Sequence, residues 1–248
     1  MNPKDLRIVF MGTPEFAVPS LHALVEQGYN VVGVVTTPDR QAGRGLKTHE
    51  CDVKVAAREL GIPVILQPEK LRDEEFLTAL RDLAPDLGIV IAFRMLPEVV
   101  WAMPRLGTFN LHASLLPQYR GAAPINWAII NGDTETGVTT FLLNHEIDKG
   151  AIIGQVREPI HPEDNIGTLY DRLMNIGSAL VIDSVNRLAA GEVQPIEQPQ
   201  SDENLRPAPK IFKEDCLIDW GRSGADSHPT AAARLAAPRP LQGGLHYR

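Results

Sequence analysis

Three polar side chains have the types and the spacing to act on a carbonyl group. Asn110 and His112 are alternate residues in the apolar run 107–112, so in a strand both would project from the same face. An amide donor beside an imidazole can stabilise the oxyanion that develops on a carbonyl under attack. Asp148 is the carboxylate that we expect to orient the imidazole and to favour its charged form. The spacing alone also fits a structural histidine at the end of a strand.

The elements that must position these side chains alternate along the chain. Apolar runs rich in β-branched residues are separated by amphipathic stretches, which is typical of a mostly parallel sheet with helices on both faces. Ligands of such sheets bind beyond the carboxyl ends of the strands. The sequence therefore predicts an α/β fold with a doubly wound sheet. We expect strands at 7–12, 31–37, 63–67, 87–93, 107–112 and 137–143, and helices after the N-cap Thr13 and at 53–60, 74–83 and 168–188.

Composition limits the classes of function. The chain has 248 residues, of which 44% are hydrophobic and 22% charged, as expected of a globular protein with a substantial core. The formal charge of −7 excludes a surface that is basic throughout, so a nucleic-acid partner would need a local group of cations. No apolar run has the length of a membrane span and no signal-peptide pattern is present, so we expect a cytoplasmic protein.

One loop has such a group of cations. Arg40, Arg44 and Lys47 are separated by Gly43 and Gly45, which make the loop flexible and its face locally positive. Taken by itself, the same pattern also fits an ordinary solvated loop.

Several ordered motifs point to a known family. They are FMGTPEFAVPSLHAL near the start, GRGLK followed by VKVAARELGIPV, NLHASLLPQYRGAAPINWAIINGDTETGVTT, and PKIFKEDCLIDW, which ends at residue 220. Over residues 6–220 the chain closely resembles the folate-dependent formyltransferases, in particular those that act on initiator methionyl-tRNA. The resemblance implies a formyltransferase-type Rossmann-like domain. It also implies direct transfer of the formyl group of 10-formyltetrahydrofolate to the methionine amino group, without a covalent enzyme intermediate.

The resemblance also implies roles for individual residues. Asn110, His112 and Asp148 would be the catalytic trio, and the cations of the glycine-containing loop would contact tRNA. Where the family usually reads D-T-G-D, this chain reads Asp148-Lys149-Gly150-Ala151, so the aspartate is present while the hydrogen bonding of its turn differs. The folate carrier would lie between two segments, namely Ser114, Leu115, Leu116 and Pro117 on one side and Phe93, Arg94, Met95 and Leu96 on the other.

Changes in amino-acid composition divide the chain into four parts. We expect a catalytic domain at 1–190 and a proline-rich linker at 191–208. Residues 209–220 would begin an incomplete C-terminal β-barrel domain, which in the family helps to grip tRNA. Residues 221–248 shift abruptly to Ala, Arg, Pro, Gly and His, which indicates an aberrant tail such as a reading-frame error; a natural disordered tail is the alternative.

Other functions stay open at this stage. A relative that formylates another amine, such as a purine-precursor ribonucleotide or an amino sugar, is disfavoured by GRGLK and PKIFKED. A remnant that binds folate or nucleic acid without turnover is disfavoured by the trio and favoured by the tail. Pro14 and Phe16 replace the glycines of a dinucleotide fingerprint, and no metal-ligand spacing occurs. We expect neither a nicotinamide cofactor nor a metal, and a monomer.

Overall fold

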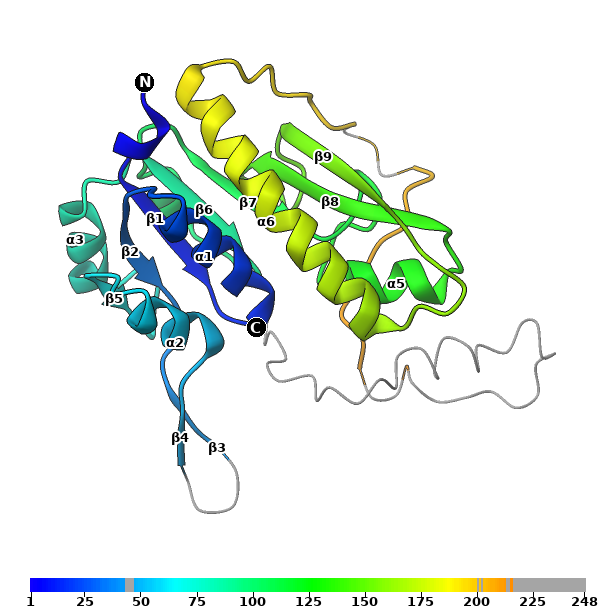
Figure 1. Cartoon of the computed structure of the whole chain (residues 1–248), viewed down its shortest axis with the longest axis horizontal. Helices are drawn as coiled ribbons and strands as arrows, with labels where there is room; N and C mark the ends of the chain where they lie inside the picture. Colours follow the sequence, from blue (N-terminus) through cyan, green and yellow to red (C-terminus); the bar gives the residue numbers. More distant parts are fainter. Residues whose placement is uncertain (43–46, 200, 202, 213–214, 216–248) are drawn as a thin grey trace.

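A seven-stranded sheet forms the centre of the molecule (Figure 1). The computed structural model describes residues 1–42, 47–199, 201, 203–212 and 215. The strand order is β5-β2-β1-β6-β7-β8-β9. The strands β5, β2, β1, β6 and β7 are parallel, and the pairs β7–β8 and β8–β9 are antiparallel. The predicted mostly parallel sheet is confirmed. The strands are β1 Ile8–Gly12, β2 Val31–Val35, β5 Ile65–Leu66, β6 Leu87–Ile91, β7 Thr108–His112, β8 Glu135–Leu142 and β9 Ile152–Pro159.

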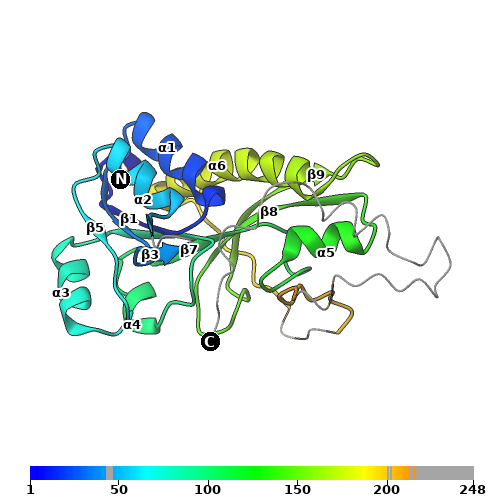
Figure 2. The same cartoon turned by 90° about the horizontal axis from the view of Figure 1, so that it is seen from below.

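Helices cover both faces of this sheet (Figure 2). One face carries α1 (Val18–Glu26), α2 (Asp52–Glu59) and the long α6 (Ile166–Ala190), and the other carries α3 (Glu74–Asp82) and α4 (Glu98–Trp101). A further helix, α5 (Pro124–Ile130), contacts β8 and α6. Because side chains alternate along a strand, Ile8 and Phe10 of β1 join the core under α1 and α6, whereas Val9 and Met11 join the core under α3. The sheet is thus buried on both faces, as its apolar strands require.

The first helix begins later than predicted, and Thr13 is not its N-cap. A 3-10 turn, η2 (Glu15–Ala17), comes first, and α1 begins at Val18 with Pro19 in its first turn. A helix that began at Pro14 would place Pro19 in its interior, where the proline ring clashes with the preceding turn and has no N–H to donate. The helix therefore begins where Pro19 is tolerated.

Several elements were not predicted, among them α4. Strand β9 completes the sheet beside β8, and α5 follows the loop after β7. A short antiparallel hairpin, β3 (Arg40–Ala42) and β4 (Lys47–His49), extends away from the body beyond the end of β2 (Figure 1). Another 3-10 turn, η1 (Pro3–Asp5), precedes β1.

The chain after α6 returns across the molecule to α5 (Figure 1). Helix α6 ends at Gly191, whose φ of 69° is the left-handed conformation of a C-terminal cap. Ile196 then pairs with Ile152 of β9, and Ala208 forms a parallel bridge with Gly121. We call the described residues 196–199 and 203–208 the strap. They lie within the predicted linker and are bonded to the body at Ile196 and Ala208. The predicted tail, residues 221–248, lies outside the described residues.

Candidate active site

Asn110 and His112 lie at the carboxyl end of β7. Strand β7 is held between β6, to which it is parallel, and β8, to which it is antiparallel. Phe109 and Leu111 belong to the core under α1 and α6, so the side chains of Asn110 and His112 project from the opposite face of the sheet. The shared face that the alternation predicts is therefore present.

The side chain of Asn110 is available to a ligand. Its Oδ1 atom is buried without a hydrogen-bond partner within the described part of the chain, and its Nδ2 atom donates no hydrogen bond there. An unpaired buried polar atom costs about 1–3 kcal/mol, so it requires an explanation in a native protein. A bound substrate that offers both a donor and an acceptor would satisfy both ends of this amide.

His112 is fixed through one of its ring nitrogens. The residue is 6% exposed, and Nε2 lies 2.8 Å from the main-chain oxygen of Tyr119. A carbonyl oxygen only accepts, so Nε2 carries the proton and donates it to this hydrogen bond. Nδ1 is the nitrogen left for a substrate. It accepts a hydrogen bond when the ring is neutral and donates one when the ring is protonated.

Asp148 lies in a turn that contacts the same loop. Its Oδ2 atom accepts from the amide of Gly121 at 2.9 Å, and its φ of 54° is left-handed. Among the described residues, Asp148 and His112 share neither a direct hydrogen bond nor an ion pair. The expected direct pairing is therefore not found. The carbonyl of Tyr119 orients the imidazole instead, and residues 119–121 connect the two side chains.

Tyr119 is held firmly from its other end. Its buried hydroxyl donates to Asp133 Oδ2 at 2.5 Å and accepts from Asn131 and Arg206 at 3.1 and 3.2 Å. Burial, together with the Asp133 carboxylate, raises the pKa of the Tyr119 hydroxyl, which stays protonated near neutral pH. Tyr119 itself has a φ of 61°. Left-handed residues other than glycine gather at functional sites, where the surroundings enforce them, and Tyr119 and Asp148 form such a pair.

The segment 114–117, expected to hold folate, is a rigid loop. The Ser114 hydroxyl donates to the carbonyl of Gln118 at 2.7 Å. Thr139 Oγ1 donates to the carbonyl of Ser114 at 2.6 Å and accepts from the amide of Leu116 at 3.1 Å. Gln155 Nε2 donates to the carbonyl of Leu116 at 2.8 Å. The polar atoms of β8 and β9 thus fix the main chain of this loop.

The side chains of this segment divide into two groups. Leu116 is buried against Phe141 and Ile152, and Ser114 is fully buried, so both side chains serve the loop itself. Leu115 and Pro117 remain partly exposed. Their folate contacts stay a prediction.

The opposite segment, residues 93–96, is anchored by its arginine. Phe93 and Leu96 are buried in the core under α3, whereas Met95 is 59% exposed. Arg94 donates to the carbonyls of Pro68 and Glu69 and lies 5.6 Å from the ring centre of Phe93. Burial lowers the pKa of Arg94. Met95 is therefore the side chain of this segment that is open to a ligand.

The predicted tRNA contacts fall on the hairpin. Arg40 begins β3 and is exposed, Lys47 begins β4, and Arg44 lies outside the described residues. At the base of the hairpin, Lys54 forms ion pairs with Asp39 at 2.5 Å and with Glu50 at 3.2 Å. The hydrogen bond from Lys54 holds the pKa of Asp39 below its usual value. These pairs fix the base of the hairpin on α2.

The sequence did not predict a role for Gln198, which contacts the Asp148 turn. Gln198 belongs to the strap, is 4% exposed, and donates to the carbonyls of Asp148 and Gly150. Its position in a proline-rich stretch predicted only a linker. Main-chain acceptors such as these leave no trace in a sequence.

Two further features bear on the class of site. The described residues contain no group of three or more His, Cys, Asp or Glu side chains that could hold a metal ion. In the same part of the chain, every helix is too short or too polar to span a membrane.

Comparison with known proteins identifies the family. The model of the formyl transferase family matches residues 6–185. The chain belongs to the formyl transferase family. A methionyl-tRNA formyltransferase of Bacteroides fragilis is 58% identical over 249 residues, which cover 96% of this chain and 76% of the relative. One of Parabacteroides distasonis is 62% identical over 226 residues, covering 90% of this chain and 69% of the relative.

Several solved structures share the fold. A sugar N-formyltransferase of Shewanella has a TM-score of 0.68 at 19% identity and covers 92% of this chain and 87% of its own. HypX of Aquifex aeolicus, solved with tetrahydrofolic acid, has a TM-score of 0.66 at 18% identity and covers 95% of this chain and 35% of its own. At these identities the likeness supports the formyltransferase-type Rossmann-like fold predicted from the sequence.

Proposed function

We propose that this chain transfers the formyl group of 10-formyltetrahydrofolate to the amino group of methionine on initiator methionyl-tRNA. The curated relatives of 58% and 62% identity are named methionyl-tRNA formyltransferases, and a solved protein of the same fold contains tetrahydrofolic acid. The observation that carries the proposal lies at the end of β7, where the amide of Asn110 and Nδ1 of His112 have no hydrogen-bond partner among the described residues. Both atoms suit a carbonyl group that gains negative charge.

The reaction needs no covalent intermediate on the protein. The methionine amine attacks the formyl carbon, a carbon–nitrogen bond forms, and the formyl oxygen becomes an oxyanion. The bond between the formyl carbon and the folate nitrogen then breaks. The amine loses one proton and the folate nitrogen gains one, so atoms and charge balance.

Asn110 and His112 act on the formyl oxygen. Asn110 Nδ2 and the protonated Nδ1 of His112 donate to it, and these bonds strengthen as its charge grows. The unpaired Oδ1 of Asn110 fits an N–H donor such as the attacking amine. The ring of His112 does not rotate during this step, because Nε2 is bonded to the Tyr119 carbonyl.

Asp148 assists the movement of the proton. One carboxylate oxygen is bonded to the Gly121 amide, which leaves the other without a hydrogen-bond partner within the described residues. That oxygen can accept the proton which the attacking amine loses, either directly or through a water molecule.

The remaining contacts follow the expected division of the site. Residues 114–117 and 93–96 bind the folate carrier, with Leu115, Pro117 and Met95 as the partly or fully exposed side chains. Arg40, Arg44 and Lys47 of the hairpin bind the phosphates of the tRNA acceptor end. A translation substrate of this kind implies a cytoplasmic enzyme, and we propose that it acts as a monomer.

A formyl-transfer assay with three acceptors tests the function. Purified protein is given 10-formyltetrahydrofolate labelled in the formyl group and either methionyl-initiator tRNA, an amino sugar nucleotide, or no acceptor. Label should pass to methionyl-tRNA alone. Transfer to the amino sugar instead would contradict the proposal, and an absence of transfer to any acceptor would support an inactive remnant.

A further inference from the structure

Within the turn that contains Asp148, Asn144 accepts from the amide of Glu146 and Lys149 pairs with Glu146, but neither contact involves Asp148 itself. Ile147 is 61% exposed, and Asp148 adopts a left-handed backbone conformation that a non-glycine residue does not favour. Among the residues that the structure describes, one group donates to the carboxylate, namely the amide of Gly121. Something outside the turn must therefore keep Asp148 in place.

The strap supplies this support through one side chain. Gln198 Nε2 donates to the carbonyl of Asp148 at 2.9 Å and to the carbonyl of Gly150 at 2.7 Å. Its Oε1 accepts from Arg120, with the shorter contact at 2.8 Å. Both N–H groups of this buried amide donate and its oxygen accepts, and these bonds link the Asp148 turn to the loop after β7.

The strap also fixes the loop that contains Gly121, the residue whose amide donates to Asp148. The amide of Tyr119 donates to the carbonyl of Arg206 at 2.7 Å, and the amide of Ala208 donates to the carbonyl of Arg120 at 2.8 Å. These bonds fix the loop that contains Tyr119 and Gly121. The Gly121 amide donates to Asp148, and the Tyr119 carbonyl accepts a hydrogen bond from His112. One segment therefore sets the distance between the acid and the imidazole.

We propose that Gln198 is a positioning residue for catalysis: it fixes the Asp148 turn against the loop that orients His112. The proposal rests on the function proposed above, since it acts through Asp148 in that reaction. It also accounts for the altered turn sequence. Lys149 and Ala151 stand where the family has other residues, but Gln198 holds the turn through main-chain oxygens, which do not depend on those side chains.

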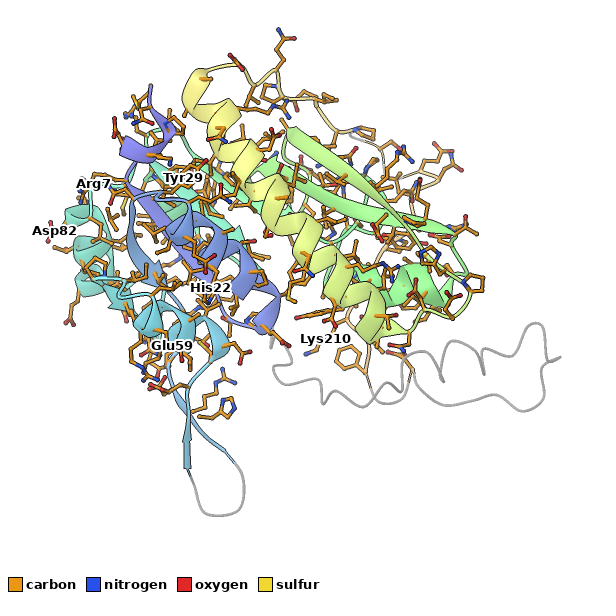
Figure 3. All side chains as sticks on the ribbon, viewed as in Figure 1. Arg7, His22, Tyr29, Glu59, Asp82 and Lys210 are labelled. Atoms are coloured by element: carbon orange, nitrogen blue, oxygen red, sulfur yellow. The ribbon has the colours of Figure 1, made fainter. Side chains whose placement is uncertain are left out.

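Kinetics of Gln198→Ala and Gln198→Met test the positioning role. The methionine variant keeps a side chain of similar length without donors, so it guards against loss of folding. We expect kcat to fall about 10- to 100-fold in both variants, with KM for methionyl-tRNA changed less than threefold. The matched control is Tyr29→Phe, which removes the hydrogen bond from the Tyr29 hydroxyl to Asn186 of α6 (Figure 3) and should leave kcat unchanged.

A double-mutant cycle separates positioning from a general structural defect. If Gln198 acts through Asp148, the Gln198→Ala change should reduce kcat less than twofold in an Asp148→Asn background. If Gln198→Ala lowers kcat as much in the Asp148→Asn background as in the wild type, the proposal is overturned. An unchanged kcat in both Gln198→Ala and Gln198→Met would also overturn it.

Amide hydrogen exchange provides a measurement that needs no activity. Gln198→Ala should raise exchange at least tenfold at residues 119–123 and 146–151, whereas Tyr29→Phe should not. Unchanged exchange in these segments would overturn the positioning role. If the wild-type protein transfers no formyl group while exchange rises as expected, the proposed function fails and the support of the Asp148 turn by Gln198 stands.

Discussion

Asn110 and His112 differ in how the protein uses them, although they project from one face of β7. His112 is already bonded through Nε2 to a main-chain carbonyl, whereas the amide of Asn110 has no partner within the described part of the chain. A polar group left unpaired in a buried place lowers the stability of the folded protein. At the scale of single residues, function and stability therefore oppose each other at Asn110.

Replacement of Asn110 should separate these two properties. Asn110→Ala removes a donor to the formyl oxygen, so kcat should fall about 100- to 1000-fold. The same change removes an unpaired buried atom, so the melting temperature should stay equal or rise by a few degrees, roughly the effect of 1 kcal/mol. Steady-state kinetics and thermal unfolding of one preparation test both expectations. Near-normal turnover would remove Asn110 from the mechanism.

The replacement of His112 should affect catalysis in a different way. His112→Gln keeps a donor but cannot carry the positive charge of a protonated ring, so kcat should fall about 100-fold or more. Substrate affinity should change little, because the charge develops only in the transition state. The ratio of kcat to KM, measured with methionyl-tRNA, gives the size of the loss, and a defect confined to KM would contradict the assigned role.

Among the elements, α6 shows most clearly how local chemistry fixes a boundary. Asn165 caps the helix by accepting from the amides of Gly167 and Thr168. Just before it, buried Asp164 accepts two hydrogen bonds from Arg172, at 2.7 and 2.6 Å. Helix α6 covers much of one face of the sheet, so this pair connects the chain before α6 to the helix that covers the core.

The stability of this element should depend on pH. The hydrogen bonds from Arg172 hold the pKa of the Asp164 carboxyl well below its ordinary value, so the fold favours the ionised form. The contribution is fully present above about pH 4 and is lost as the pH falls further, toward the folded-state pKa. Asp164→Asn should lower stability by about 2–3 kcal/mol at pH 7, or roughly 4–12 °C in melting temperature. Its melting temperature should also change less than that of the wild type between pH 5 and pH 3. Parallel curves for the two proteins would contradict this account.

At the scale of the whole molecule, charge restricts where tRNA can bind. The net charge of −7 repels a polyanion, so we propose that binding depends on the cations of the hairpin sequence. The hairpin also extends away from the body beyond the sheet (Figure 1).

Salt dependence tests the hairpin directly. Arg44→Ala should reduce the slope of log affinity against log salt by about 1, because one fewer counterion is released on binding. The matched control is Arg81→Ala, which removes an equal charge from the exposed last turn of α3. Equal slopes for the two variants would argue against a phosphate contact at Arg44.

The sequence was informative where side-chain pattern carries the structure. The strands of the parallel part and the fold class follow from apolar runs separated by amphipathic stretches. The shared face of Asn110 and His112 follows from their alternate positions in one strand. The start of α1 was placed wrongly because the effect of Pro19 outweighed the capping signal of Thr13. The contacts of His112 with Tyr119 and of Gln198 with Asp148 involve main-chain oxygens. Any residue offers such an acceptor, so no pattern could predict them.

Gly121 is the point at which these connections meet. A Cβ atom built there would lie 2.4 Å from the carbonyl oxygen of Ala208, and the φ of Gly121 is 126°. Even one methyl group at Gly121 would push the strap away from the loop. The same shift would displace the Gly121 amide that donates to Asp148. Attachment of the returning chain and placement of the carboxylate therefore cannot be varied independently at this position.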